Sequence, residues 1–286
     1  MSKKFYSENE ELNFGDSLNT FKDLFKYIKS KTPTLEEALL EMFENAMFEN
    51  AQLSKNEKNE KNEAKELYNF LYIECNKKIE NNWNSIIQEH KNITKIDALI
   101  ISSYTYEPMA KYRKFSPYRL LNTNLVAINR KNGVKNVIKY LFLFLKSLRK
   151  LEKCKKNVLF RFIPCKVKLE KDPNNNKYVP YQKGLEKIFW PFTSTSDDEK
   201  TAEKFLDNGK GTIFKIEGKD LWGYDISLFN VCNEKEILLE PERKCLIENI
   251  KEGNNITEVT LKIIDNPKLL EICDFLKLVR NIIFNI

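Results

Sequence analysis

The stretch VLFRFI, residues 158–163, marks the point at which the chain changes character. It is short, apolar and rich in aromatic and β-branched residues, which is typical of a β-strand. Similar runs follow at 212–216, 236–239 and 244–247, and turn residues separate them. We therefore predict a β-rich region from about residue 157 onward.

The part of the chain before this stretch predicts helices. Apolar residues recur at helical spacing over 18–28 and again over 134–148. Thr34 is followed three residues later by Glu37, a capping box that marks the start of another helix. The charged repeat KNEKNEKNE at 55–63 is either an exposed linker or a solvated helix surface. Helices first and strands second indicate an α+β architecture with a helical N-terminal half, rather than alternating βαβ units.

Composition excludes several classes of protein. The 286 residues include 42% hydrophobic residues, which excludes a disordered chain. Lys and Arg number 48 and Asp and Glu 41, a formal net charge of +7. The basic residues are scattered and do not interleave with aromatics, so we expect a solvated basic surface rather than a nucleic-acid site. The single histidine, His90, makes a catalytic triad or a multi-histidine metal centre an unfavourable interpretation.

The start of the chain, MSKKFYSENEE, has no apolar signal core, which predicts a cytoplasmic protein or one delivered by a non-Sec route. In that setting the six cysteines, none of them in a CxxC pair, are expected to be reduced thiols. The longest apolar stretch, around 138–145, is too short to span a bilayer, so no membrane partner is expected.

Two stretches in the β-rich region carry polar groups that need an explanation. A guanidinium at Arg161, inside an apolar strand, is costly unless a carboxylate or a phosphate pairs with it. The alternative is an arginine on the exposed face of an edge strand. Residues 193–195 are three hydroxyl residues ahead of a helix that Ser196 and Glu199 would cap. These hydroxyls could donate to a ligand, or they could form a turn that binds nothing.

A third stretch is Glu234-Lys235-Glu236-Ile237. On a strand, alternate side chains share a face, so Glu234 and Glu236 would point one way. Lys235 and Ile237 would point the other way, into the core. Paired carboxylates beside a cleft can stabilise an oxocarbenium ion and orient an incoming nucleophile, as in glycoside chemistry. The alternative is a solvated strand face.

The three stretches occur in an order that is itself informative: Arg on one strand, Ser-Thr-Ser ahead of a helix, and Glu-x-Glu on a later strand. In this order the sequence resembles the arginine-type mono-ADP-ribosyltransferases, whose signature is Arg, Ser-Thr-Ser and then Glu-x-Glu. The resemblance continues through PFTSTSDDEKTAEKFL, GKGTIFKIEG and EKEILLEP, and covers about residues 65–250. It implies that family's fold, a helical part followed by a mixed, mainly antiparallel two-sheet β core.

The resemblance also implies a reaction. The bond between nicotinamide and ribose in NAD is cleaved, and ADP-ribose is transferred to an arginine of a protein acceptor. NAD would be the co-substrate, and no metal is required. Arg161 would hold the NAD phosphates, and Ser194 would position the nicotinamide side. Glu236 would stabilise the charge that develops as nicotinamide leaves, and Glu234 would orient the acceptor guanidinium. The other residues implied to bind NAD are Phe160, Thr195 and Ser196.

By the same resemblance, the segment Trp222 to Asn233 is the loop that recognises the acceptor. Its rings, Trp222, Tyr224 and Phe229, would either contact the partner or pack in the core. The chain departs from the family at Phe162, where Gly is frequent, and at Val231, where many toxin-like members have an aromatic residue.

The resemblance predicts a helical N-terminal extension at 1–64, which ends in the charged repeat, and a catalytic domain at 65–286. Within that domain, 65–156 would be the helical part and 157–286 the β-rich part. Two alternatives to the transferase remain open: an NAD glycohydrolase on the same fold, and a catalytically inactive NAD-binding or interaction module.

Overall fold

The computed structural model describes residues 32–50, 57–126, 130–167, 169, 181–201, 209–219, 221–241 and 243–264. The described residues form two compact units. The helical unit draws on Asn19–Glu152 and on the loop Tyr224–Lys235, and the sheet unit draws on Lys153–Gly223 and on the chain from Glu236 onward. The helix predicted at 18–28 lies outside the described residues.

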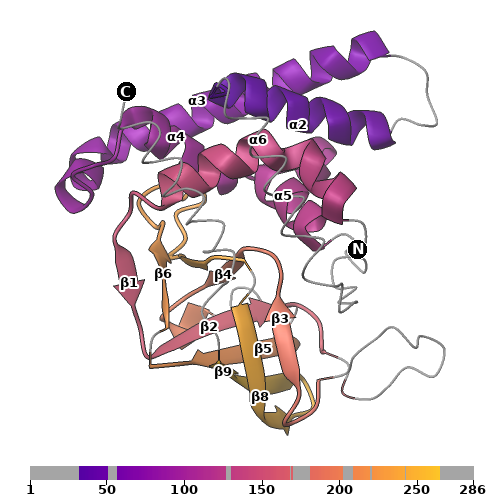
Figure 1. Cartoon of the computed structure of the whole chain (residues 1–286), viewed down its shortest axis with the longest axis vertical. Helices are drawn as coiled ribbons and strands as arrows, with labels where there is room; N and C mark the ends of the chain where they lie inside the picture. The colour runs from indigo at the N-terminus through magenta and orange to yellow at the C-terminus, as the bar shows by residue number, and fades with distance from the viewer. Residues whose placement is uncertain are drawn as a thin grey trace. The chain divides into compact units, whose positions relative to one another are not determined.

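Helices α2 to α6 build the helical unit (Figure 1). The predicted capping box begins α2, because the Glu37 N–H donates to Thr34 Oγ1 at 3.1 Å and the Thr34 N–H donates to Glu37 Oε2 at 2.9 Å. The charged repeat is helical from Glu57 onward, so the solvated-helix alternative is correct there. The elements are α2 Leu35–Asn50, α3 Glu57–Glu89, α4 Lys95–Tyr104, η1 Ala110–Phe115, α5 Pro117–Val126 and α6 Arg130–Leu148.

Apolar stripes on these helices form the core of the helical unit. The stripe predicted over 134–148 is buried wherever its side chains are described, at Val137, Ile138, Leu141, Leu145 and Leu148. A stripe with a spacing of three to four residues covers one side of a helix, so burial of this stripe seats α6 against its neighbours.

A buried carboxylate ties α4 to the end of α6. Asp97 is 5% exposed, and its side chain accepts a hydrogen bond from Ser147 Oγ at 2.9 Å and one from Lys150 Nζ at 2.5 Å. The same carboxylate accepts the Thr94 N–H at 3.0 Å, which completes the cap of α4. A buried charge is tolerated when hydrogen bonds and an opposite charge satisfy it, as they do here.

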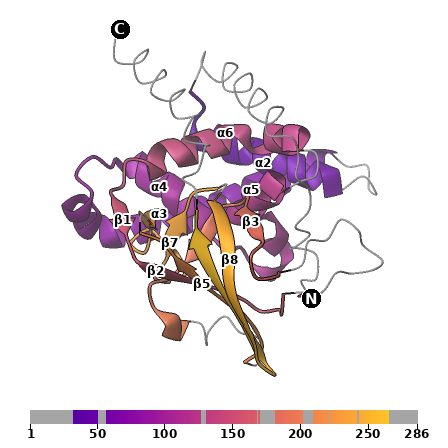
Figure 2. The ribbon, with the colours of Figure 1, turned by 60° about the horizontal axis from the view of Figure 1, so that its bottom comes forward.

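Two sheets make up the sheet unit. The five-stranded sheet has the order β2-β5-β9-β8-β3, and the four-stranded sheet has the order β1-β6-β7-β4. Strands β5 and β9 pair in parallel, whereas β2–β5, β3–β8, β8–β9 and β4–β7 are antiparallel. The labels β2, β5 and β8 mark the larger sheet in Figure 2. The strands are β1 Lys153–Lys155, β2 Val158–Ile163, β3 Glu186–Phe189, β4 Thr193–Thr195, β5 Gly211–Glu217, β6 Trp222–Asp225, β7 Ile237–Leu239, β8 Arg243–Glu252 and β9 Ile256–Ile263.

The strands predicted at 158–163, 212–216 and 244–247 are confirmed within β2, β5 and β8. The run predicted at 236–239 is a strand only from Ile237. Buried residues of both sheets share one apolar core, which contains Leu159 and Ile163 of β2 together with Ile237 and Leu239 of β7.

Gly223 allows β6 and β7 to approach closely. A Cβ at this position would lie 2.7 Å from Ile237 Cγ2 and 2.9 Å from the Leu238 carbonyl oxygen. Both distances are shorter than van der Waals contact, so only glycine fits without a shift of β7. The position of β7 matters for the site because Glu236 directly precedes this strand.

Candidate active site

Arg161 lies on the core-facing side of β2. Side chains alternate along a strand, so Arg161 shares a face with Leu159 and Ile163, both of which are buried in the apolar core. Phe160 and Phe162 occupy the opposite face and stack, with ring centroids 6.4 Å apart and an interplanar angle of 5°. The bulk of Phe162 therefore lies on the face of the strand opposite Arg161.

Arg161 is half-buried as a residue, and its guanidinium is directed towards β4. Its Nη1 donates a hydrogen bond to the Ser194 carbonyl oxygen at 3.1 Å. Among the described residues it has no carboxylate partner. Although β2 is an edge strand, as the alternative expected, the side chain is not fully exposed. An arginine has five N–H donors, so most of them remain for an anion.

Backbone pairing joins β2 to β4 and β4 to β7. The Phe160 N–H donates to the Ser196 carbonyl oxygen at 2.7 Å, and the Ser196 N–H donates to the Phe160 carbonyl oxygen at 2.8 Å. On the other side of β4, Ser194 lies opposite Leu238. Glu236 directly precedes Ile237, the first residue of β7, which lies opposite Thr195. Backbone pairing therefore brings Arg161, residues 194–196 and Glu236 to neighbouring strands of the sheet unit, whereas Glu234 belongs to the helical unit.

The three hydroxyls of residues 194–196 have different environments. The Ser194 side chain is exposed, and within the described part of the chain its hydroxyl makes no hydrogen bond. The buried Thr195 hydroxyl donates to the Ile237 carbonyl oxygen and so connects β4 to β7. The buried Ser196 hydroxyl accepts the Asp198 N–H at 3.1 Å. Of the three, the Ser194 hydroxyl alone is both exposed and available.

The helix cap predicted from Ser196 and Glu199 is not formed as expected. Ser196 accepts the Asp198 N–H instead, and a short 3-10 turn, η2 Glu199–Thr201, follows. Two successive turn bonds satisfy the backbone here, because Asp198 Oδ1 in turn accepts the Lys200 N–H at 3.0 Å. The helix predicted after this turn falls on residues outside the described part of the chain.

The prediction that Glu234 and Glu236 share a strand face is wrong, because both precede β7. Glu234 and Lys235 are exposed, whereas Glu236 is only 7% exposed. The prediction that Lys235 points into the core is wrong for the same reason, but Ile237 is buried as expected. The chain is irregular from Ile226 to Glu236, between β6 and β7, and within it Asn233 has a φ of 59°. Local turn geometry, rather than strand alternation, therefore directs the two carboxylates.

The aromatic residues of the loop Trp222 to Asn233 pack inside the protein. Trp222, Tyr224 and Phe229 are 7%, 1% and 0% exposed, so the core-packing alternative is correct for all three. The exposed part of the loop is polar and includes Cys232 and Asn233, next to Glu234.

Sequence reasoning missed the cations that surround Trp222. Arg243 is fully buried, its Cζ lies 4.2 Å from the Trp222 ring centroid, and its Nη2 donates to the Trp222 carbonyl oxygen at 3.0 Å. Lys153 Nζ lies 3.7 Å from the same centroid. The only signal in the sequence is an arginine that opens a β-prone run, and this signal does not specify a ring partner.

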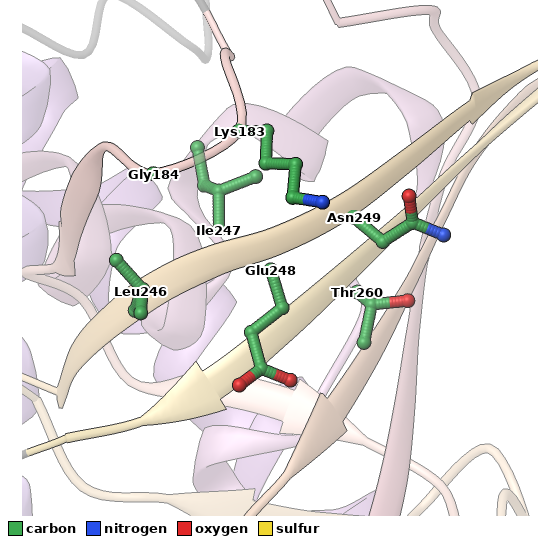
Figure 3. A pocket seen from close by; sticks show the side chains of 7 residues that line it. All are labelled: Lys183, Gly184, Leu246, Ile247, Glu248, Asn249 and Thr260. Carbon is green, nitrogen blue, oxygen red and sulfur yellow. The ribbon is translucent and has the colours of Figure 1, made fainter.

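A hollow of about 560 Å³ lies elsewhere in the sheet unit (Figure 3). It is formed by β8 near Ile247, by Thr260 of β9 and by the turn at Lys183 and Gly184. Its single carboxylate, Glu248, pairs with Lys262 at 3.3 Å. None of the predicted site residues lines this hollow, so it is not part of the candidate active site.

The described residues contain neither a helix suited to cross a membrane nor a cluster suited to hold a metal. No described helix combines the length and the apolar character that a membrane crossing requires. Within the same residues, no group of three or more His, Cys, Asp or Glu side chains is arranged to hold a metal ion.

Comparison with known proteins shows a likeness in fold. No protein-family model matches the chain, and no curated protein matches it by sequence. The structure of the type III effector XopAI from Xanthomonas axonopodis pv. citri is similar to that of this chain, with a TM-score of 0.51 and 15% sequence identity. The match covers 90% of this chain and 96% of the XopAI chain. At this identity the likeness is one of fold.

Two further solved structures are named as ADP-ribosyltransferases. HopU1 of Pseudomonas syringae pv. Tomato is 18% identical, with a TM-score of 0.49 and coverage of 68% of this chain and 87% of its own. The Vis toxin from Vibrio splendidus is 21% identical, with a TM-score of 0.45, and the match covers 69% of this chain and 86% of the Vis chain. The predicted α+β fold, with a helical part and a mixed, mainly antiparallel two-sheet core, is confirmed, and its structural neighbours include ADP-ribosyltransferases.

Proposed function

We propose that this chain is an NAD-dependent mono-ADP-ribosyltransferase that transfers ADP-ribose from NAD to an arginine of a protein acceptor and releases nicotinamide. The observation that carries the proposal is the state of Arg161, which is half-buried beside the Ser194 backbone without a carboxylate partner among the described residues. A guanidinium in this position pairs well with a phosphate oxygen, and the pyrophosphate of NAD supplies such oxygens.

In this proposal Glu236 is the catalytic glutamate. Its carboxylate would accept a hydrogen bond from the ribose 2′-hydroxyl and stabilise the positive charge that grows on the ribose as nicotinamide leaves. Glu236 is 7% exposed, and a negative charge acts more strongly where little water screens it. Nicotinamide leaves as a neutral molecule from a cationic ring, so the step needs no general acid.

The remaining predicted residues have supporting roles in the proposal. Ser194 presents its free hydroxyl to the nicotinamide side, and Glu234, which is exposed, orients and deprotonates the acceptor guanidinium. Phe160, Thr195 and Ser196 hold the strand ends around the site, since each connects neighbouring strands or turns.

The proposed catalytic domain is 65–286, with 1–64 as an N-terminal extension. The order of Arg161, residues 194–196 and the Glu234–Glu236 pair supports the assignment, and so does the backbone pairing that gathers β2, β4 and β7.

The proposal is tested by incubating the purified chain with labelled NAD and either agmatine or an arginine-rich protein. We expect label transfer and nicotinamide release by the wild type. Glu236→Gln should lower both rates by at least about 100-fold, because it removes the charge that stabilises the transition state. The matched control Glu252→Gln changes an exposed glutamate at the end of β8 and should leave both rates within about twofold.

Arg161→Lys provides a second measurement. Lysine keeps the charge but cannot form a bidentate pair, so we expect the KM for NAD to rise by about 10-fold or more. Nicotinamide release without labelling of any acceptor would identify a glycohydrolase instead. Thermal stabilisation by NAD with no turnover in the wild type would identify an inactive binding module. Either result, or undiminished transfer by Glu236→Gln, contradicts the proposal.

A further inference from the structure

The loop that ends at Glu234 belongs to the helical unit and is shaped by one buried asparagine. The residues Tyr224–Lys235 lie in the helical unit, whereas Glu236 lies in the sheet unit. Asn230 is 2% exposed, and its Oδ1 accepts the Cys232 N–H at 2.9 Å and the Glu234 N–H at 3.4 Å. Its carbonyl oxygen accepts the Asn233 N–H at 3.1 Å. These bonds wind residues 230–234 into a compact turn.

Side chains from α3 and from Thr105, the residue directly after α4, hold the middle of this loop. Asn82 Nδ2 donates to the Leu228 carbonyl oxygen at 2.7 Å, and the Val231 N–H donates to Thr105 Oγ1 at 2.9 Å. Between these two attachments, Phe229 is completely buried and its ring centroid lies 5.8 Å from that of His90. The backbone up to Val231 is therefore fixed by contacts within the helical unit.

A third attachment reaches the residue next to Glu234. Lys78 Nζ donates to Asn233 Oδ1 at 2.7 Å. Lys78 lies four residues before Asn82 on α3, so the two side chains emerge from the same side of that helix. They flank a buried stripe of α3 that contains Cys75 and Ile79, each 1% exposed. Partial burial lowers the pKa of Lys78, because the charged ammonium loses part of its hydration at this position.

The backbone conformation of Asn233 explains why its hydrogen bond with Lys78 affects the direction of Glu234. Its φ of 59° lies in the left-handed region, which non-glycine residues adopt only in tight turns and which asparagine tolerates better than most. A change at this residue redirects the chain immediately before Glu234. A hydrogen bond that immobilises the Asn233 side chain therefore also fixes the direction in which Glu234 leaves the turn.

We propose that Lys78 is a positioning residue for acceptor recognition, acting through Asn233 on Glu234. This inference rests on the proposed function. Lys78 contributes to transfer of ADP-ribose to a guanidinium acceptor, and it does not contribute to cleavage of NAD, because its contacts lie with the loop and not with Arg161, Ser194 or Glu236.

The test compares Lys78→Met with Lys77→Met in the full-length chain. Lys77 is the adjacent lysine on α3 and is exposed, so its substitution matches the change in charge and helix propensity. For Lys78→Met we expect the kcat/KM for agmatine to fall by about 10-fold or more, chiefly through KM. Nicotinamide release without acceptor should change by less than about twofold, and Lys77→Met should alter neither rate by more than about twofold.

Two further variants separate positioning from general damage. Lys78→Arg keeps an N–H donor and should restore most of the transfer. Asn233→Gly removes the acceptor of the Lys78 bond but keeps a backbone that accepts positive φ. Because Lys78 and Asn233 act through one bond, the double variant Lys78→Met with Asn233→Gly should lose no more transfer than the more affected single variant.

Hydrogen exchange at the backbone amides of 232–234 supplies a readout that does not depend on activity. We expect faster exchange in Lys78→Met and unchanged exchange in Lys77→Met. Unchanged exchange in Lys78→Met overturns the positioning role. In an active wild type, equal loss of transfer and of NAD cleavage in Lys78→Met, or no loss of transfer, overturns it too. A wild type that does not cleave NAD overturns the proposed function itself, which distinguishes the two failures.

Discussion

Arg161 differs from Arg113, Arg119 and Arg243 in what its guanidinium contacts. Arg113 and Arg119 both form ion pairs with Glu107, at 3.6 and 3.3 Å. Arg243 is fully buried against the ring of Trp222. Arg161 donates to one backbone carbonyl and has no described carboxylate beside it. A cation left in this state is suited to an external anion, because its remaining donors can exchange water for stronger, charge-assisted hydrogen bonds to a phosphate.

The titration of Asp97 makes a testable contribution to stability. Burial by itself would raise the pKa of this carboxyl, but hydrogen bonds from Lys150, Thr94 and Ser147 outweigh burial and hold the pKa below its ordinary value of 3.8. A depressed pKa in the folded state means that Asp97 contributes stability above pH 3.8. This contribution is lost as the pH falls from 3.8 through the lower folded-state pKa.

We therefore expect Asp97→Asn to lower the free energy of unfolding at pH 7 by about 1–3 kcal/mol. Between pH 5 and the acid transition, the difference between wild type and variant should shrink as the pH falls. Urea unfolding at a series of pH values measures it, with the exposed Glu152→Gln as control. If the difference in free energy of unfolding between wild type and Asp97→Asn stays constant down to the acid transition, the charge of the Asp97 carboxylate is not the source of the stabilisation.

At the scale of elements, the site depends on how closely β4, β6 and β7 approach one another. The Thr195 hydroxyl bonds to the Ile237 carbonyl oxygen from one side of β7. On the other side, Gly223 has no side chain, so Ile237 and the Leu238 backbone can pack directly against its Cα. Glu236 is the residue directly before this strand, so the packing of β7 helps to set its position.

Gly223→Ala tests this dependence. The added Cβ would lie 2.7 Å from Ile237 Cγ2 and 2.9 Å from the Leu238 oxygen, so β7 must shift. We expect the free energy of unfolding to fall by about 1–3 kcal/mol, as overpacking usually gives. We also expect the rate of NAD cleavage to fall by more than the decrease in the folded fraction of the protein explains. Thermal unfolding and nicotinamide release measure the two. Gly218→Ala is the control, since its nearest described neighbour is 3.4 Å away. Full activity in a stable Gly223→Ala variant would contradict the argument.

At the scale of the whole molecule, the net charge of +7 comes from 48 basic and 41 acidic residues. Many described lysines are committed to exposed ion pairs, such as Lys95 with Glu80 at 2.7 Å and Lys215 with Glu217 at 2.7 Å. Such a surface attracts an anionic dinucleotide only weakly and over a distance that salt shortens.

Raising the ionic strength should therefore weaken the binding of NAD only modestly. Between about 0.05 and 0.5 M NaCl we expect the KM for NAD to rise by about two- to fivefold and kcat to stay nearly constant, because salt screens long-range attraction more than a direct ion pair of a phosphate with Arg161. Steady-state kinetics over that range measure the effect. A steep salt dependence together with tight binding of duplex or single-stranded nucleic acid would instead support a polyanion-binding protein.

The sequence by itself determined the order of helices and strands, the capping box at Thr34 and the stretches that hold the candidate residues. These features depend on periodicity and on neighbours a few residues apart, which a single chain displays directly. It also indicated Arg161, because an arginine inside an apolar strand is unusual whatever the strand packs against.

Only the tertiary structure decided how these stretches meet. Strand alternation predicted the direction of Glu234 and Glu236 wrongly, since a turn held by Asn230 and Lys78 displaces the start of β7 to Ile237. The aromatic residues of the loop could have been surface contacts and are core. The bond from Lys78 to Asn233 joins residues 155 positions apart. No local pattern encodes such a bond, because its energy depends on a distance that exists only once the chain has folded.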